Sequence, residues 1–208
     1  DAKIWQMAAT GDRVFFYVED VTFGQEMWTS DGTPEGTHAL TSFGYFEPFG
    51  DYYSTQQLVV AGDRAFFPAT NGIDGMQLWV TAEPGTTASP LLEVCPYLDC
   101  FYEYWIYAVG SQVFFLNSDT EHGTEVWTSD GRLSGTHLLH DACPGTCTGS
   151  GSVLASSTGR LVYSGSSGDP YTPTVFVATA PWTTALSLFD AVRGAPLLDL
   201  YGNVSGAD

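Results

Sequence analysis

Short apolar runs separated by turn residues recur along the whole chain. The first group comprises residues 5–10, 14–18, 26–29 and 37–40. Runs of this length that are rich in Val, Phe, Tyr and Thr and are bounded by Gly and Asp are typical of β-strands. No stretch has the apolar period of an amphipathic helix, so the pattern predicts four short strands joined by turns.

This group of four runs returns three more times, at residues 57–92, 105–139 and 152–188. An aromatic residue marks the third run of each group, at Trp28, Trp79, Trp127 and Phe176. Four strands in about 50 residues, repeated without helices, are typical of β-propeller blades. The sequence therefore predicts an all-β fold, a β-propeller of about four four-stranded blades of about 50 residues. The predicted blades are residues 4–45, 56–95, 104–143 and 152–190.

The end of the chain resembles the beginning of yet another unit. Residues 195–203 have the character of an opening strand and its turn. We expect residues 191–208 either to start a further blade or to close the ring by pairing with the first blade. Because four blades close only around a tight centre, we expect residues 1–208 to be one propeller domain or a segment of a larger propeller or assembly.

Two of the four units share a longer motif. Residues 26–38 read EMWTSDGTPEGTH, and residues 125–137 read EVWTSDGRLSGTH. In both, Asp-Gly (Asp31-Gly32 and Asp130-Gly131) fits a tight turn in which Gly takes a positive φ and the Asp carboxylate accepts backbone N–H groups. The repeated Trp is interpreted as packing between blades. The second and fourth units lack the Asp-Gly pair, which indicates that blades of two kinds alternate.

The motif resembles the bacterial ELWxxDGTxxGT repeat family of large secreted or surface proteins. The first unit has Met27 in place of the Leu, and the third has Val126 there and Arg132 in place of the first Thr. The second unit keeps only Gln77-Leu78-Trp79, and the fourth has lost most of the motif. The resemblance implies a propeller and a surface or adhesive role, and it implies no particular reaction.

Charge excludes one class of partner. The chain has 6 Lys and Arg against 24 Asp and Glu, a net charge of −18. Nucleic-acid affinity depends on basic residues that displace counterions, so nucleic acid is not an expected partner. No apolar run approaches the roughly 20 residues that cross a bilayer, and no signal sequence opens the chain. We expect either that a signal was removed or that the chain begins inside a longer one.

Four cysteines form two close pairs, Cys95 with Cys100 and Cys143 with Cys147. Neither pair has the additional His or Cys ligands of a zinc site, and the Pro and Gly between them favour tight loops. The sequence predicts two local disulfides. Disulfides persist in oxidising compartments, so we expect a secreted or cell-surface protein.

Carboxylates on Gly-containing loops are weak candidates for Ca²⁺ ligands, because calcium prefers six to eight oxygen atoms in a flexible loop. The candidates are Asp20, Asp74, Asp119 and Glu121. No Asp-x-Asp-x-Asp spacing occurs, so a solvated acidic rim is the preferred interpretation and no cofactor is predicted. His38 and His137 occupy equivalent positions in two blades, too far apart to share a metal, and are expected on strand surfaces.

Aromatic residues crowd the two connections between the first three units. They are Phe46, Phe49, Tyr52, Tyr53, Tyr97, Phe101, Tyr102 and Tyr104. Such side chains can stack on sugars, dock a protein or pack beneath long loops. The leading hypothesis is an extracytoplasmic structural and binding module, not an enzyme, that engages proteins or cell-surface glycans. A glycan-binding lectin is the alternative, followed by a polysaccharide-active enzyme with two converging carboxylates.

Overall fold

The computed structural model describes residues 2–20, 24–42, 58–69, 76–82, 85–95, 105–147, 149, 152–166 and 173–187. These residues form four antiparallel sheets of four strands, each in the order in which its strands occur along the chain. We call the sheets blades 1 to 4. The all-β fold and the four four-stranded units that the sequence predicts are therefore confirmed.

The strand bounds follow the predicted runs closely. Blade 1 contains β1 (Lys3–Thr10), β2 (Arg13–Asp20), β3 (Gly24–Ser30) and β4 (His38–Ala39). Blade 2 contains β5 (Val59–Ala61), β6 (Arg64–Ala69), β7 (Met76–Ala82) and β8 (Thr87–Cys95). Blade 3 contains β9 (Ile106–Val109), β10 (Gln112–Asp119), β11 (Gly123–Ser129), the 3-10 turn η1 (Leu133–Gly135) and β12 (His137–His140). Blade 4 contains β13 (Val153–Ser157), β14 (Arg160–Ser166), β15 (Pro173–Thr179) and β16 (Ala185–Ser187).

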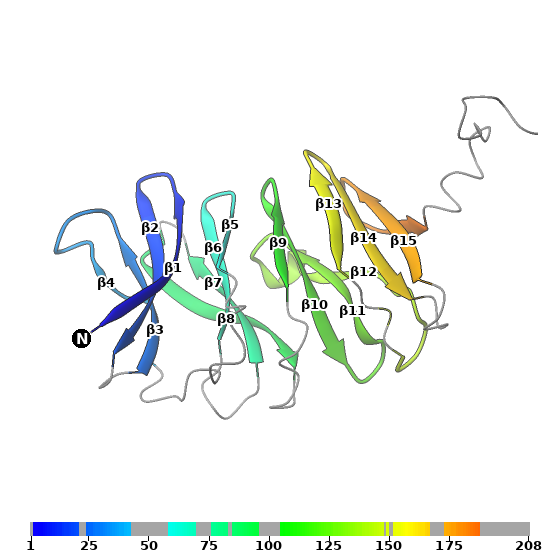
Figure 1. Cartoon of the computed structure of the whole chain (residues 1–208), viewed down its shortest axis with the longest axis horizontal. Coiled ribbons are helices and arrows are strands. Elements are labelled where there is room, and N and C mark those ends of the chain that lie inside the picture. The colour runs from blue at the N-terminus through cyan, green and yellow to red at the C-terminus, as the bar shows by residue number, and fades with distance from the viewer. Residues whose placement is uncertain are drawn as a thin grey trace, which may run out of the picture.

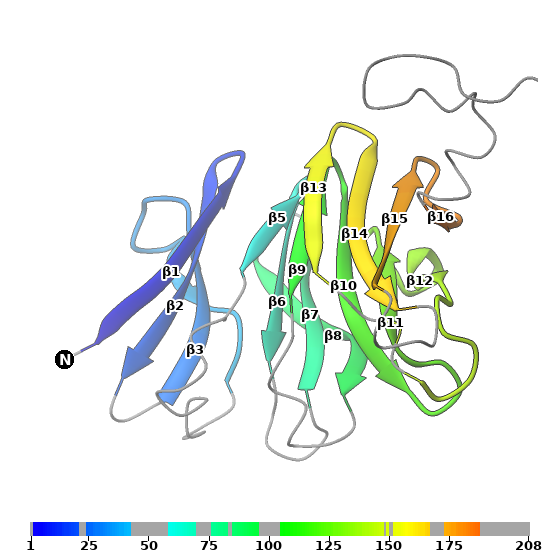
Figure 2. The same ribbon diagram turned by 45° about the vertical axis from the view of Figure 1, so that its right-hand side comes forward.

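The blades stand side by side in chain order (Figure 1). Their first strands face one another along one side of the row, where β1 contacts β5, β5 contacts β9, and β9 contacts β13. Figure 2 shows the same order from a second direction, with blade 1 at one end and blade 4 at the other. In the described residues the row is therefore an open arc.

The hydrophobic cores lie between neighbouring blades. Three clusters of buried side chains fill the spaces between blades 1 and 2, blades 2 and 3, and blades 3 and 4. The Phe66-Phe67 pair in β6 of blade 2 shows how one strand contributes side chains to two cores. Successive side chains in a strand point to opposite faces, so Phe66 packs toward blade 3 and Phe67 toward blade 1.

Candidate binding surface and the turns that shape the blades

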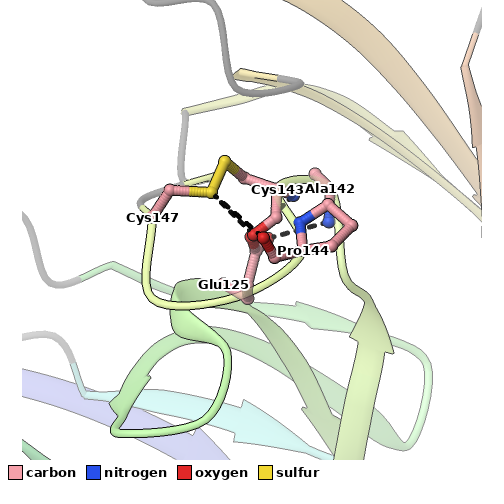
Figure 3. The surroundings of a disulfide bond; sticks show 5 residues. All are labelled: Glu125, Ala142, Cys143, Pro144 and Cys147. Carbon is pink, nitrogen blue, oxygen red and sulfur yellow. Dashed lines mark hydrogen bonds between the residues drawn. A yellow bond between two sulfur atoms is a disulfide. The ribbon is translucent and has the colours of Figure 1, made fainter.

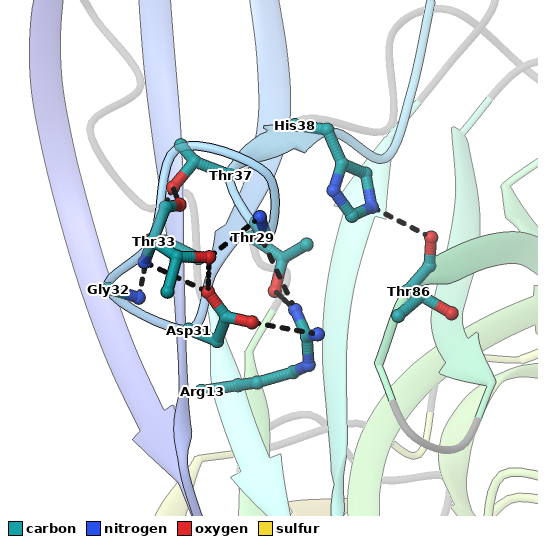
Figure 4. Close-up of polar contacts among 10 residues, drawn as sticks. Arg13, Thr29, Asp31, Gly32, Thr33, Thr37, His38 and Thr86 are labelled. Carbon is teal, nitrogen blue, oxygen red and sulfur yellow. Dashed lines mark hydrogen bonds and ion pairs between the residues drawn. The ribbon is translucent and has the colours of Figure 1, made fainter.

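The Asp-Gly turn of blade 1 is held by its own side chains (Figure 4). Asp31 Oδ1 accepts the Thr33 backbone N–H at 2.9 Å and the Thr33 hydroxyl at 2.7 Å. The Arg13 guanidinium lies 3.8 Å from Asp31 Oδ2. The hydrogen bonds from Thr33 and the nearby Arg13 hold the pKa of Asp31 below its usual range, despite an opposing contribution from desolvation. The carboxylate therefore stabilises the turn.

Blade 3 repeats this turn with Arg132, Leu133 and Ser134 in place of Thr33, Pro34 and Glu35. Asp130 Oδ1 accepts the Arg132 backbone N–H at 2.9 Å, and the Arg132 side chain reaches Asp130 Oδ2 at 3.1 Å. In both turns the motif's second Gly cannot be replaced without movement, because a Cβ on Gly36 or Gly135 would collide with the Asp carboxylate. These contacts give the Asp-Gly-Thr-x-x-Gly motif a structural role in the described turns.

The motif's histidine joins one blade to the next. His38 Nε2 lies 3.0 Å from the backbone oxygen of Thr86 in blade 2 (Figure 4), and His137 Nε2 lies 3.0 Å from that of Trp182 in blade 4. The two histidines are half-buried or exposed strand residues, as expected, and they also bridge blades. This inter-blade contact was not apparent from the sequence.

The third-to-fourth-strand turns of blades 2 and 3 fit against the preceding blade. A Cβ on Gly85 of blade 2 would lie 2.9 Å from Phe15 Cζ of blade 1. A Cβ on Gly131 of blade 3 would lie 2.8 Å from Arg64 Cδ and 3.1 Å from Phe66 Cζ of blade 2. These turns have no spare room, so close approach of a turn to the neighbouring blade is part of each interface.

In blade 1 the same kind of turn meets no other blade among the described residues. Gly32 has φ +89°, close to the +86° of Gly131, but a Cβ there would meet no atom within 4 Å. Val14 is 38% exposed, whereas Val113, its counterpart in blade 3, is fully buried. Met7 is 68% exposed, whereas its counterpart Ile106 is 6% exposed. Among the described residues, this face of blade 1 is therefore apolar and uncovered.

The counterparts are fixed by strand register. Val14 pairs with Ala9 and Phe16 with Met7 in blade 1. Val113 pairs with Ala108 and Phe115 with Ile106 in blade 3. Because directly opposed residues share a sheet face, the matched positions point toward the preceding blade in each case. We call this surface the leading face.

Blade 4 leaves the opposite surface uncovered, the face that in other blades meets the next blade. Leu154 and Leu186, which are 56% and 57% exposed, belong to its outer strands. Val162 and Val177 pair across β14 and β15 and are half-buried. At the matching positions of blade 2, Phe66 and Val80 are buried against blade 3. We call this surface the trailing face.

A buried carboxylate lies beneath the cysteine loop of blade 3 (Figure 3). Glu125 is 1% exposed, and its oxygens accept the backbone N–H groups of Cys143 at 3.0 Å and Ala142 at 3.3 Å. Burial raises the pKa of Glu125 to about 7, the Asp141 carboxylate adds to the rise, and the backbone N–H groups oppose it. Glu125 therefore holds the loop. The sequence did not predict this role for Glu125. Glu26 occupies the same position of the motif in the first unit, and that unit has no cysteine loop after the motif.

The loop is closed by a disulfide between Cys143 and Cys147. We expect the double substitution to Ser to lower the free energy of unfolding by about 2 kcal/mol, because the bond closes only five residues. Urea unfolding of the two proteins measures the difference, and a thiol assay on the native protein should detect neither sulfur. Reaction of Cys143 or Cys147 in the folded protein would contradict the bond. The predicted Cys95–Cys100 pair lies outside the described side chains.

Several other predicted residues also lie outside the described part. They are Asp74, Phe46, Phe49, Tyr52, Tyr53, Tyr97, Phe101, Tyr102 and Tyr104. The roles of the aromatic connections in glycan or protein binding remain predictions.

The described calcium candidates do not assemble into a metal site. Asp119 Oδ1 accepts the backbone N–H groups of Glu121 and His122, and its other oxygen lies 3.0 Å from His122 Nδ1. Hydrogen bonds from His122 and Glu121 lower the pKa of Asp119 against the opposing effect of desolvation. Among the described residues, no group of three or more His, Cys, Asp or Glu is placed to hold a metal ion. Asp20 and Asp119 are hairpin residues at the ends of β2 and β10.

The marker aromatics of blades 2 to 4 pack toward the preceding blade. Trp79 stacks with Phe67 at a centroid distance of 6.3 Å, and Phe176 stacks with Tyr163 at 5.3 Å. Trp127 packs against the core between blades 2 and 3. Trp28 occupies the same position on the leading face of blade 1 and is half-buried.

Comparison with solved structures identifies the fold. A puromycin hydrolase S511A mutant complexed with PGG, a β-propeller-containing protein, matches with a TM-score of 0.53 and 14% identity, over 89% of this chain and 28% of that chain. This chain has a β-propeller fold. TolB from Acinetobacter baumannii matches with a TM-score of 0.45 and 11% identity, over 85% of this chain and 40% of that one. A prolyl endopeptidase matches with a TM-score of 0.45 and 13% identity, over 89% and 35%.

The propeller blades described here span less than half the length of these matched proteins. No protein-family model and no curated protein matches the sequence. The described part of the chain contains no helix with the length and apolar character needed to cross a bilayer.

Proposed function

We propose that this chain is an extracytoplasmic β-propeller module of the ELWxxDGT type whose function is to bind a protein partner through its leading face. The uncovered face of blade 1 carries this proposal. Met7 is 68% exposed there, although its counterpart Ile106 is buried at 6%. Contiguous exposed apolar surface on a soluble protein marks interaction sites.

Two further features support the proposal. The Cys143–Cys147 disulfide fits an oxidising compartment. Glu125, the described carboxylate whose pKa is raised furthest, is 1% exposed and bound by backbone N–H groups, so it is not presented to a substrate. Both features favour a binding module over an enzyme.

Site-specific photocrosslinking tests the binding function. A photoreactive amino acid is placed at Met7 in the full chain, in cells that produce the protein, and adducts are identified by mass spectrometry. The matched control is Leu133, which is 70% exposed but lies on η1, away from the leading face. We expect protein adducts at position 7 and not at position 133. Equal labelling at both positions, or none at position 7, would exclude a partner on this face.

A further inference from the structure

We propose that the partner of the leading face is a second copy of this chain, with the trailing face of its blade 4 packed on blade 1. This inference rests on the proposed binding function and names the partner. It starts from the interface between blades 2 and 3 as the described residues form it. That interface joins a blade without the Asp-Gly turn to a blade with it, and blade 4 meeting blade 1 would join the same two kinds.

The residues that receive the Asp-Gly turn recur in blade 4. In blade 2 these residues are Arg64, Phe66 and Val80, the three whose atoms lie nearest to a Cβ built on Gly131. In blade 4 the same register places Arg160, Val162 and Val177. Both sets therefore consist of one arginine and two apolar residues at equivalent points of the sheet. The trailing face of blade 4 has the chemistry that accepts a Gly131-type turn.

Blade 1 supplies the matching turn. Gly32 has the backbone conformation of Gly131, and no atom lies within 4 Å of a Cβ built on it. Met7 and Val14 of blade 1 occupy the positions that Ile106 and Val113 occupy in blade 3. In blade 3 these two residues belong to the core that is shared with blade 2. Val162 is smaller than Phe66, and the flexible side chain of Met7 can fill irregular space in such a core. Blade 1 therefore carries the other half of the interface.

Charge favours this head-to-tail pairing over contact between two leading faces. Asp31 lies beside Gly32 and is partly exposed, so two leading faces in contact would bring two carboxylates together. In the head-to-tail arrangement the exposed Arg160 takes the place of Arg64 beneath the Asp-Gly turn. Opposite charges then meet at the edge of an apolar surface, which favours this partner over the symmetric alternative.

Two such contacts close a ring. Each copy provides one leading and one trailing face, so two copies related by a two-fold axis satisfy both. The described sheets of two copies number eight, four from each, which lies within the range of about 4 to 8 blades typical of propellers. Neither apolar end face remains exposed in this assembly.

The mass of the full chain in solution tests the proposal without any variant. We expect analytical ultracentrifugation at micromolar concentration to give twice the mass of one full chain. A mass of one chain, or of more than two, would overturn the two-copy ring. Crosslinks from position 7 to a different protein would also overturn it, while the proposed binding function would survive.

Variants on the two faces test the head-to-tail arrangement. Met7→Lys on the leading face and Leu186→Lys on the trailing face should each give single-chain mass, because each places a charge in the apolar contact. Leu133→Lys is the control; Leu133 is as exposed as Met7, at 70% against 68%, but is remote from both faces, so the two-chain mass should remain. Loss of pairing in the Leu133 variant would show a nonspecific effect and count against the proposal.

Mixing the two variants gives the decisive result. The Met7→Lys chain keeps a native trailing face and the Leu186→Lys chain a native leading face, so an equal mixture should regain the two-chain mass through one intact contact. If two leading faces were in contact instead, the Leu186→Lys chain would keep the two-chain mass by itself and the Met7→Lys chain would not be rescued. Single-chain mass in the mixture would therefore overturn head-to-tail pairing, and circular dichroism checks that each variant is folded.

Discussion

Replacing Trp182 with Ala should lower the free energy of unfolding by about 3–5 kcal/mol, the cost typical of removing a buried Trp or Phe. Trp182 is buried in the core between blades 3 and 4, where its ring lies 4.9 Å from that of Phe114 in an edge-to-face arrangement. Its backbone oxygen also lies within hydrogen-bonding distance of His137. The substitution leaves a cavity at the centre of one inter-blade interface, and urea unfolding followed by circular dichroism measures the loss.

A second substitution separates the ring from the backbone. Trp182 has φ 66°, a conformation that costs a non-glycine residue about 1 kcal/mol or more. Trp182→Gly loses the same ring but relieves that strain, so it should be about 1 kcal/mol less destabilising than Trp182→Ala. Trp182→Phe keeps an aromatic ring and should cost least of the three. If all three variants unfolded like the native protein, Trp182 would not hold blade 4 to blade 3.

Stability should fall with rising pH on account of Glu125. Its pKa is raised from the ordinary value of 4.5 to about 7 in the folded protein. The folded state therefore holds this proton more tightly than the unfolded state. The contribution is fully present below pH 4.5 and is lost as the pH rises through about 7. At about 1.4 kcal/mol per pH unit, the loss is about 3 kcal/mol.

Glu125→Gln removes this titration. Other groups also titrate, so the quantity to follow is the difference in unfolding free energy between the native protein and the variant, measured by urea unfolding from pH 4 to pH 8. We expect the native protein to lose about 3 kcal/mol relative to the variant over this range. Glu26→Gln is the matched control; burial also raises the pKa of Glu26, but this residue is only half-buried and should give a smaller change of the same sign. A difference that does not change with pH would contradict the raised pKa of Glu125.

The blades could be predicted because their signals are local in the sequence. The strand runs and the Gly and Asp residues that bound them lie within one unit, and the spacing of Trp28, Trp79 and Trp127 shows that the unit repeats. Contacts between units could not be predicted in the same way. The oxygen that His38 contacts belongs to Thr86, 48 residues away, and its position depends on how blade 2 docks.

The candidate binding surface shows the same limit. Met7 and Ile106 are equally apolar in the sequence, and only the arrangement of the blades shows that one is uncovered and the other buried. Glu26 and Glu125 share a motif position, yet the cysteine loop after the third unit encloses only Glu125. Such distinctions depend on what lies across an interface, which a single unit does not encode.

Two kinds of interface alternate along the row of blades. The histidine contact occurs where blade 1 meets blade 2 and where blade 3 meets blade 4. The Gly131 turn closes the interface between blades 2 and 3 instead. Removing or adding a single blade would place two blades of the same kind together. Two blades with the motif would have both the histidine contact and the Asp-Gly turn at one interface, and two blades without it would have neither. Duplication or deletion in steps of two blades would therefore keep every contact of a kind that the described blades already contain.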